Sequence, residues 1–465
     1  METAGFGVPG GNVRLAVVAG ERALLVPEET HGFEGPLVDL DGLRVRCCRP
    51  TPLAAARIRE LVPALRPRPL GAHGSSFGFG DRVGLATPGH VRALRASGSQ
   101  LAPVLAQQSA RELERTGRSF TEVLDGATWG ALESGWTSGY GADADHLRSE
   151  TDVSAAVAAG FTMLTLDPSD HVDHTAATIH GVALEERVSA LPWQALEDDW
   201  PAMRRRHARL GSDLEIARAA AVFGRALVQV ASLARVAEAS ANEPDLDLEV
   251  SVDETTRPTT ALEHAFLAVE LRRLGVRFTG LAPRFPGEWE KGVELRGGRE
   301  AVSDALATHA RVAREHGGYR VSVHSGSDKF SVYPLLAAHQ ASAWHVKTSG
   351  TSYLEALRVV AAVEPELFRD VLRVAEAHFG EDRHTYAVGR TAGVPEPTSV
   401  ADAELSALLD DDDARQCLHV TFGSVLSDAA LAAALRQALV AADDAYANAL
   451  VAHFRRHLEP LRRLR

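Results

Sequence analysis

The sequence predicts an α/β protein built on a (β/α)8 TIM-like barrel, with a small β-rich N-terminal unit, a helical insertion after the fourth barrel strand and a C-terminal helical extension. Three observations predict it. Strand-like segments alternate with helical periodicity from about residue 75 onward, eight such segments can be counted, and 465 residues are too many for one comfortable core. A hydrophobic content of 45% with 24% charged residues is typical of a soluble globular protein.

The first unit, residues 1–72, alternates short Val/Leu runs with Gly and Pro, as in VRLAVVAG, RALLVP and LRVRCCRP. That texture is typical of a small β-rich unit. The catalytic barrel is then expected over residues 73–365.

The expected barrel strands are each followed by a helical pattern such as SARELERT or SYLEALRVVAAV. They are 77–87, 102–107, 139–147, 161–169, 246–254, 276–285, 319–327 and 343–350. The main interruption, about 170–242, is too long for a crossover and contains EIARAAAVFGRALVQVASLARVAEA, so it predicts a helical insertion. Residues 366–465 predict further helices that pack on the barrel, with the acidic run 410–413 as a solvated loop.

Composition argues against several classes of partner. The net charge of −13 opposes nucleic-acid binding, because phosphates require a basic surface. We find no run of about 18 uncharged apolar residues and no signal-peptide pattern, so we expect no membrane association and a cytoplasmic location. Three cysteines cannot build a disulfide framework, and the adjacent Cys47 and Cys48 are read as ordinary thiols rather than a zinc site. A homo-oligomer is compatible with the sequence.

The ends of the expected strands are rich in chemically useful side chains. In such barrels the active site lies at the carboxyl ends of the strands. The residues there are Asp81, Gln107, Asp145, His146, Asp167, Asp253, Glu254, Arg284, His324, His345 and Lys347. Three of the eight ends supply a histidine, which indicates a shared metal or acid/base centre.

Strand alternation predicts which of these side chains face the barrel interior. In YRVSVHSGS the valines share one face and His324 lies on the other, so His324 is expected to point inward. The same alternation points His345 and Lys347 inward. In GADADHL, Asp145 and His146 fall on opposite faces, so one must turn away unless the strand ends there.

Strand alternation also orients the side chains at the end of LDLEVSVDE. Here alternation favours Asp253 inward and leaves Glu254 just past the strand. The dense loop LDPSDHVDHT is a competing metal site, with Asp167 as its best candidate, although such loops often serve as helix caps. Imidazoles with a carboxylate and an open position suit Zn²⁺, Mn²⁺, Co²⁺, Ni²⁺ or Fe²⁺.

The loop Ser325–Lys329 follows His324 and precedes a helix start. Its backbone N–H groups and Lys329 predict an anion-binding position for a carboxylate or phosphate, with a plain helix-capping loop as the alternative. The loop lacks the P-loop spacing, and FGFGDRVG has the wrong spacing for a dinucleotide site.

As an ordered set, the motifs resemble the tagaturonate epimerase family over about residues 77–425. They are GFGDRVGLATPGH, QQSARELERTG, GADADHL, TLDPSDHVD, SVDETTRPTTALEH, LAPRFPGEWEKGVE, VHSGSDKFSVYP, HVKTSGTSYLEALR and RQCLHVTFGSVL. The resemblance implies a metal-dependent isomerase that interconverts D-tagaturonate and D-fructuronate in hexuronate breakdown. It further implies that Asp145 is the proton acceptor, that Glu254 is the proton donor with Asp253 as its rival, and that the metal ligands are His146, His324 and His345.

The inverted carbon of such a substrate lies β to the ketone, so its C–H is not acidified. Retro-aldol cleavage and re-addition to the other aldehyde face would invert it, with a divalent metal ion at the ketone and an acid/base group on each face. The candidate substrate-binding residues are Asp81, Gln107, Arg284, Lys291, Ser325, Lys329 and Lys347.

Two other functions are weighed against the epimerase. One is an aldolase or isomerase that acts on a related ketose acid and, in the aldolase case, releases the cleavage products. The other is a non-catalytic sugar-acid binding protein, which would lack the acid/base pair, whereas Asp145 and Glu254 are both present.

Overall fold

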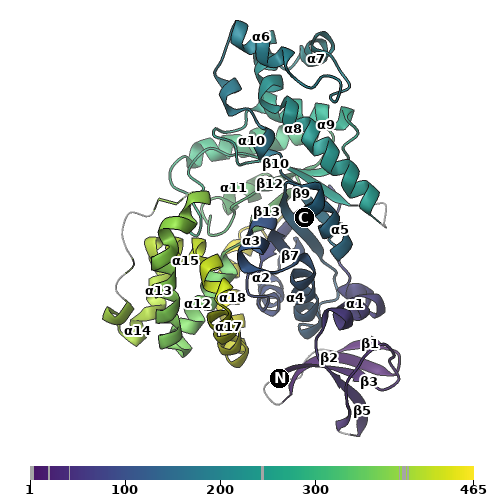
Figure 1. Cartoon of the computed structure of the whole chain (residues 1–465), viewed down its shortest axis with the longest axis vertical. Coiled ribbons are helices and arrows are strands. Elements are labelled where there is room, and N and C mark those ends of the chain that lie inside the picture. Colours follow the sequence, from purple (N-terminus) through teal and green to yellow (C-terminus); the bar gives the residue numbers. More distant parts are fainter. Residues whose placement is uncertain are drawn as a thin grey trace.

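The computed structural model describes residues 5–18, 21–40, 42–241, 246–386, 388–389, 394 and 397–464. Within them eight parallel strands close into a barrel, and they neighbour one another in chain order (Figure 1). The strands are β6 (Ser76–Gly80), β7 (Ala102–Ser109), β8 (Gly141–Leu147), β9 (Met163–Leu166), β10 (Asp247–Val252), β11 (Phe278–Pro283), β12 (Arg320–Val323) and β13 (Trp344–Thr348). The predicted barrel and each of its eight strands are confirmed.

Several strands are shorter than predicted because polar groups turn the chain at their carboxyl ends. The segment expected over 77–87 stops at Gly80, since the carboxylate of Asp81 accepts hydrogen bonds from the amides of Val83, Gly84 and Ala86. These bonds replace the ladder with a tight loop, so the chain enters its helix early.

Helices cover the outside of the barrel. They are α2 (Thr87–Ser97), α3 (Ala110–Thr116), α4 (Phe120–Glu133), α5 (Glu150–Ala159), α9 (Ala261–Arg273), α10 (Arg299–Glu315), α11 (Tyr333–Ala338) and α12 (Thr351–Val363). Helices α3, α4 and α9 begin with capping boxes, in which a Ser or Thr and a Glu three residues later bond each other's backbone amides. Local sequence therefore marks these helix starts.

The N-terminal unit is a five-stranded antiparallel sheet in the order β1-β2-β3-β5-β4. Its strands are β1 (Phe6–Val8), β2 (Gly11–Val18), β3 (Glu21–Pro27), β4 (Leu37–Leu40) and β5 (Leu43–Cys48). Helix α1 (Pro52–Leu61) and a short 3-10 turn, η1 (Pro63–Leu65), connect it to the barrel. Figure 1 shows the sheet below the barrel, at the opposite end of the molecule from α6 (Val182–Ser189) and α7 (Trp200–His207).

The insertion after β9 comprises η2 (Ser169–His171), η3 (His174–Ala177), α6 (Val182–Ser189), α7 (Trp200–His207) and α8 (Asp213–Ser240), at the top of Figure 1. Its expected end at residue 242 falls outside the described residues. Helix α8 is long and apolar enough to cross a membrane, but 72% of its most apolar window is buried against the protein. Its contacts with α5, α9 and α6 account for its composition.

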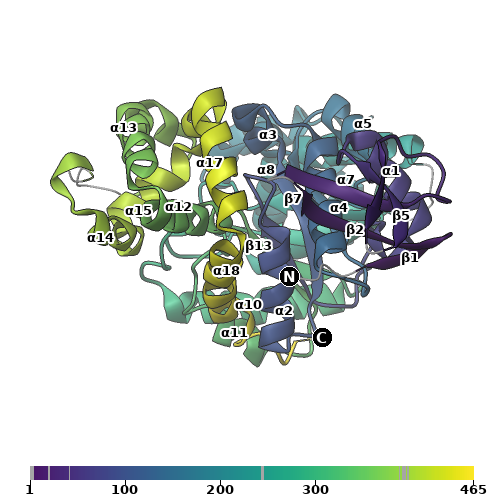
Figure 2. The same ribbon diagram turned by 90° about the horizontal axis from the view of Figure 1, so that it is seen from below.

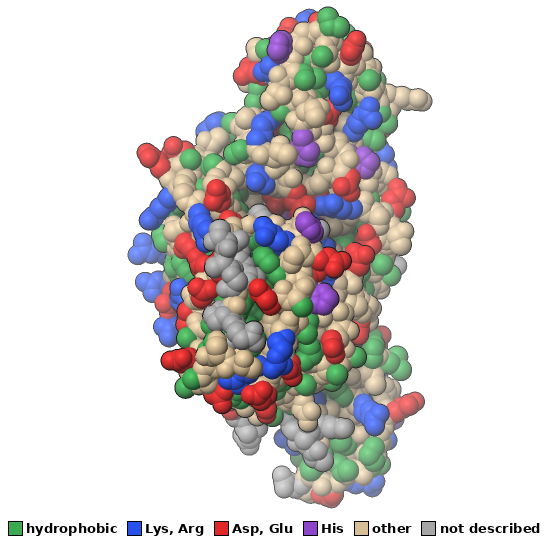
Figure 3. All heavy atoms as spheres, turned by 60° about the vertical axis from the view of Figure 1, so that its left-hand side comes forward, with side chains coloured by type: hydrophobic (Ala, Val, Ile, Leu, Met, Phe, Trp, Pro, Cys, Tyr) green, Lys and Arg blue, Asp and Glu red, His purple; other side chains and the backbone are tan. Residues whose placement is uncertain are grey.

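The C-terminal extension lies along one side of the barrel (Figure 2). It contains α13 (Pro365–Asp382), η4 (Arg383–Thr385), η5 (Pro397–Ser399), α14 (Asp402–Leu405), η6 (Ser406–Asp410), α15 (Asp412–Val420), α16 (Phe422–Ser427), α17 (Ala429–Ala441) and α18 (Asp443–Leu458). Helix α18 packs closely on α2, where a Cβ at Gly89 would lie 2.5 Å from Cδ1 of Leu450. Figure 3 shows acidic and basic side chains interspersed over one face of the molecule.

The floor of the barrel is held by a buried ion pair. Arg320, fully buried, places Nη2 3.3 Å from Oδ2 of Asp247. The same carboxylate accepts hydrogen bonds from the amides of Leu70 and Gly71, at 2.6 and 3.1 Å. Asp247 therefore joins the segment that leaves the N-terminal unit to the amino-terminal end of the barrel.

We expect Asp247→Ala to lower the free energy of unfolding by about 3–5 kcal/mol, because it leaves the Arg320 guanidinium buried without its partner. Chemical denaturation of the two proteins measures this. Arg311→Ala is the control, since Arg311 pairs with Glu315 on the surface of α10 and its loss is worth about 0.5 kcal/mol or less. Equal effects of the two substitutions would contradict the role given to Asp247.

Candidate active site

A cavity of about 520 Å³ opens at the carboxyl ends of the barrel strands. Among the predicted site residues it is lined by Gln107, Asp145, His146, Glu254, Arg284, Lys291, Ser325, His324 and Lys347. Asp253 lines it as well. The structure thus brings together groups that come from strands and loops spread over about half of the chain.

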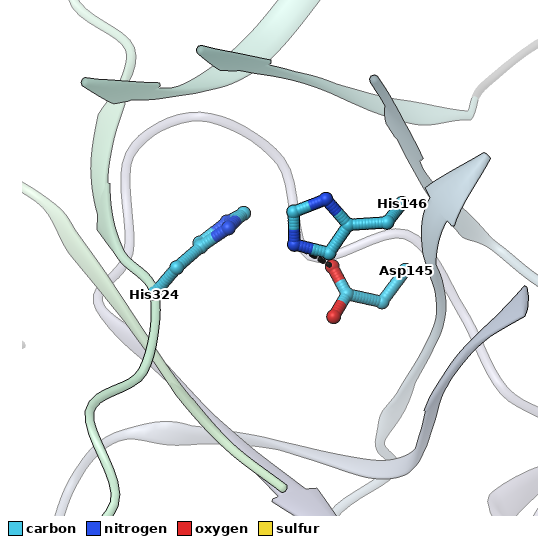
Figure 4. A group of neighbouring side chains, drawn as sticks. All are labelled: Asp145, His146 and His324. Carbon is cyan, nitrogen blue, oxygen red and sulfur yellow. Dashed lines mark ion pairs between the residues drawn. The ribbon is translucent and has the colours of Figure 1, made fainter. Parts of the chain in front are cut away.

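Three potential metal ligands meet in this cavity. Asp145, His146 and His324 each offer a ligand atom within 4.8 Å of the other two. Figure 4 shows His324 projecting from one wall toward His146 and Asp145 on the other, and the two imidazole rings are 5.0 Å apart at 78°. Metal–ligand bonds of about 2.0–2.2 Å would require these donors to close in slightly around one ion.

A local backbone distortion lets Asp145 and His146 face the same cavity. His146 has φ of +53°, and the pairing of β8 with β9 shifts register between Ala144 and Leu147. The left-handed conformation turns the side chain of His146 away from the outer face that alternation would give it. Such a conformation costs about 1–3 kcal/mol and persists where the surroundings hold it, often at functional sites.

Below the cluster, a buried lysine joins three carboxylates at the barrel axis. Nζ of Lys347 lies 2.8 Å from Oδ2 of Asp143, 2.8 Å from Oδ1 of Asp145 and 2.9 Å from Oε1 of Glu249. Burial opposes ionisation of all three acids. The ammonium group outweighs it for Asp145 and Glu249, whose pKa values are lowered, whereas burial raises the pKa of Asp143 to about 6. The charges leave this layer net negative, which favours a cation above it.

Carboxylates also contact both imidazoles of the cluster. His324 places Nε2 2.7 Å from Glu249 and Nδ1 3.1 Å from Asp253, and Nδ1 of His146 lies 3.0 Å from Asp167. Burial lowers the pKa of each imidazole, but Asp145 and Asp167 raise that of His146 to about 9, and Asp253 and Glu249 raise that of His324 to about 10. These carboxylates would equally stabilise a divalent cation, which binds the neutral imidazole and therefore displaces its proton.

One wall of the cavity, next to His324, carries two cations without an acidic partner among the described residues. Nζ of Lys291 donates to Oγ of Ser325 at 2.6 Å, and Nη1 of Arg284 donates to the carbonyl of Asp253 at 3.0 Å. Burial lowers the pKa of Lys291, and the nearby Asp253 opposes that shift. Ser325 has φ of +52°, which directs its hydroxyl to the lysine instead of continuing β12. This wall can bind an anion.

At the cavity mouth, Glu254 is held by two arginines. Nη2 of Arg111 and Nη2 of Arg148 lie 2.8 and 2.5 Å from its two oxygens. Arg148 also contacts Asp167 at 2.9 Å. These contacts fix the position of Glu254, whereas Asp253 lies deeper, against His324 and Ser251.

Lys329, Asp81 and His345, all proposed from the sequence, do not line the cavity. Lys329 is buried with Nζ on the carbonyls of Glu290, Val293 and Ser327, so it fastens the loop and the predicted anion position retains only Ser325. Asp81 is occupied by backbone amides, as described above. His345 bonds Oγ of Ser76 through Nδ1 at 2.8 Å. It precedes Lys347 by two residues on β13, about 6.6 Å further from the mouth, and is not part of the three-residue cluster.

Four residues that contact the site were not among the candidates chosen from the sequence: Asp143, Glu249, Arg111 and Arg148. Glu249 shares the inward face of its strand with Asp253, a signal that the sequence contains, but it lies in mid-strand rather than at the strand end. The two arginines belong to α3 and to the loop after β8. Their meeting at Glu254 depends on the closed barrel. Of the loop LDPSDHVDHT, Asp167 reaches the cluster through His146, while Asp173 caps η3.

Comparisons with known proteins identify the family. Residues 15–461 match the family model described as UxaE, tagaturonate epimerase. A tagaturonate/fructuronate epimerase of Thermotoga maritima is 41% identical over 454 residues, which cover 96% of this chain and 92% of that protein.

Solved structures give the same relationship. The native crystal structure of fructuronate-tagaturonate epimerase UxaE from Cohnella laeviribosi superimposes with a TM-score of 0.89 at 32% identity, covering 98% of this chain and 95% of that one. The structure of the same enzyme with two glycerols gives a TM-score of 0.90 over the same shares. Because the match in sequence and in fold extends over nearly the whole chain, the protein belongs to the tagaturonate epimerase family.

Proposed function

We propose that this protein interconverts D-tagaturonate and D-fructuronate, with a divalent metal ion held by Asp145, His146 and His324. The observation that supports it is a single cavity that is lined both by the ligand cluster and by the cations Lys291 and Arg284. A hexuronate carries a ketone for the first group and a carboxylate for the second. The names of the relatives from Thermotoga and Cohnella point to the same pair of substrates.

The metal site is proposed on the chemistry of its donors. Two imidazoles and one carboxylate suit Zn²⁺, Mn²⁺, Co²⁺, Ni²⁺ or Fe²⁺. When bound, such an ion supplies Lewis acidity at the ketone end of the substrate. The net negative layer formed by Asp143, Asp145 and Glu249 around Lys347 favours its binding.

The inverted carbon lies β to the ketone, so we propose a retro-aldol route. A base removes the proton of the hydroxyl on that carbon, the bond to the neighbouring carbon breaks, and its electron pair passes to the ketone fragment as an enediolate. The other fragment is an aldehyde that carries the carboxylate. Rotation of its carbonyl group, re-formation of the bond and return of a proton to oxygen give the epimer with all atoms conserved.

Two carboxylates are proposed for proton transfer. Asp145, which is ionised beside Lys347, is proposed both to belong to the ligand cluster and to take the hydroxyl proton. Glu254, fixed by Arg111 and Arg148, serves the other face. Asp253 is assigned a different task, since it contacts His324 and orients that imidazole.

Anchoring of the carboxylate distinguishes an epimerase from an aldolase. The aldehyde fragment must stay bound while its carbonyl rotates, and its carboxylate is its only charged group. We propose that Lys291, Ser325 and Arg284 hold that carboxylate; Gln107 lines the same cavity. Release of the fragment would instead be the behaviour of an aldolase.

The test is direct. Metal-stripped protein is reloaded separately with each of the five ions and incubated with D-tagaturonate, and the mixture is followed by NMR. We expect D-fructuronate to form with at least one ion and chelation to abolish turnover. Accumulation of cleavage products would indicate an aldolase, and absence of any conversion would refute the proposed reaction.

His324→Ala should abolish turnover and reduce bound metal at least 10-fold, because it removes one of three ligands. Metal content is measured by mass spectrometry on folded protein. His345→Gln is the matched control, since His345 is a buried barrel histidine outside the cluster. Loss of metal in the control but not in His324→Ala would reverse the assignment of the ligands.

Lys291→Met should raise the KM for D-tagaturonate about 10- to 100-fold, because a charged hydrogen bond to a carboxylate is worth about 1.5–3 kcal/mol. We also expect free cleavage products to become detectable, since the anchored fragment would escape. Lys291→Arg, which keeps the charge, should recover part of the affinity. An unchanged KM in Lys291→Met would remove this residue from the carboxylate site.

A further inference from the structure

The C-terminal extension reaches the loops that form the anion-binding wall. The connecting residue is Arg415 of α15, whose side chain is nearly fully buried. Its Nε donates to the carbonyl of Gly292 at 2.7 Å, and its Nη2 donates to Oδ2 of Asp328 at 2.9 Å. Its Nη1 donates to the carbonyl of Leu409 within the extension at 2.8 Å. One guanidinium therefore joins the loop after β11, the loop after β12 and the extension.

The two loops joined in this way carry the proposed carboxylate anchor. Gly292 directly follows Lys291, and Asp328 lies three residues after Ser325. The hydrogen bond between Lys291 and Ser325 at 2.6 Å closes the arrangement on the cavity side. Any shift of one loop relative to the other would separate this pair.

The loop after β12 needs such support because it is conformationally strained. Both Ser325 (φ +52°) and Asp328 (φ +62°) adopt the left-handed region, which disfavours residues other than glycine. Asp328 is held from the extension by α18 as well, since its amide donates to Nε2 of His457 at 3.1 Å and its Oδ1 lies 2.6 Å from Nε2 of His453. The strain is therefore balanced by contacts outside the barrel.

The loop after β11 is held by a second residue of the same helix. Gln416 of α15 donates through Nε2 to Oε2 of Glu290 at 2.8 Å. Glu290 and Gly292 flank Lys291 on both sides, so α15 contacts a side chain before the lysine and the backbone after it. Neither Arg415 nor Gln416 lines the cavity.

The group Asp328, His453 and His457 also has the composition of a metal site, with ligand atoms within 4.8 Å of one another. Its donors are already engaged with one another and with their surroundings. Nε2 of His457 accepts a hydrogen bond from the backbone amide of Asp328. The carboxylate of Asp328 is hydrogen-bonded to Arg415, Thr351 and His453. These mutual bonds make the group an anchor for the loop rather than a place for an ion.

We propose that Arg415 is a positioning residue that sets substrate affinity by keeping Lys291 and Ser325 together for the substrate carboxylate. This inference rests on the proposed function. It assigns to the C-terminal extension a role in substrate binding, while the metal cluster, held by the barrel strands, should be independent of it.

The experiment compares Arg415→Lys with Arg358→Lys in the full chain. Arg358 is a matched control because it also donates to the carbonyl of Leu409, as well as to that of Ser406, yet it contacts neither loop. Binding is measured by isothermal titration with a pre-equilibrated mixture of D-tagaturonate and D-fructuronate, together with kcat, metal content and the unfolding midpoint. We expect Arg415→Lys to weaken binding about 10-fold with unchanged metal content and kcat within about threefold, and Arg358→Lys to bind as the wild type does.

The outcomes separate this inference from the proposed function. Wild-type affinity in Arg415→Lys, or an equal loss in both variants, would overturn the positioning role. If the wild type binds the sugar acids without converting them, the proposed reaction is rejected, and the affinities of the two variants still decide the role of Arg415. If the wild type does not bind them, the proposed reaction and the positioning role are both rejected. If Arg415→Lys does not fold, Asp328→Asn replaces it, and a wild-type affinity in that variant likewise overturns the proposal.

Discussion

The contact between the Lys347 ammonium and three carboxylates at the barrel axis underlies the rest of the site. It joins β8, β10 and β13 inside the barrel, where TIM barrels usually pack branched apolar side chains. A buried ion pair is costly to form and far more costly to break, so these strands are held in one register at this level. The excess of negative charge faces the layer above, where His146 and His324 lie. The chemistry at the mouth thus follows from the polarity of the core.

The two functional groups of side chains in the cavity are supported by different parts of the chain. The ligand cluster belongs to the barrel strands, and its one irregularity is the left-handed His146. The anion-binding wall belongs to longer loops, whose strain at Ser325 and Asp328 is borne by α15 and α18. On the proposed function, a barrel without the extension would keep the ligand cluster and lose the support of the proposed carboxylate anchor. This division explains why so many polar residues of the extension are buried although they do not reach the cavity.

The candidates chosen from the sequence are wrong where the length and direction of a side chain decide whether it enters the cavity. Lys291 and Lys329 both belong to polar loops, yet Lys291 enters the cavity while Lys329 turns to three backbone carbonyls. The long lysine stem allows either result, and the spacing of residues along the chain does not distinguish them. Glu249 is missed for the opposite reason. Its inward orientation is visible in the strand pattern, but its importance comes from meeting Lys347 and His324, which lie about 75 to 100 residues later in the chain.

By itself the sequence determined the eight strands, their alternation with helices, the insertion, the extension and the ordered motifs of the family. These depend on local periodicity and on short segments, which are read along the chain. It also determined that Asp145, His146, His324 and Lys347 lie near strand ends. Only the tertiary structure decided which of them meet. Closure of the barrel brings β8 and β12 face to face across the axis, and the left-handed turn at His146 reverses the alternation that would have separated it from Asp145. The pairing of Lys291 with Ser325 and its support by Arg415 were likewise decided there, because contacts between distant loops have no signature in local sequence.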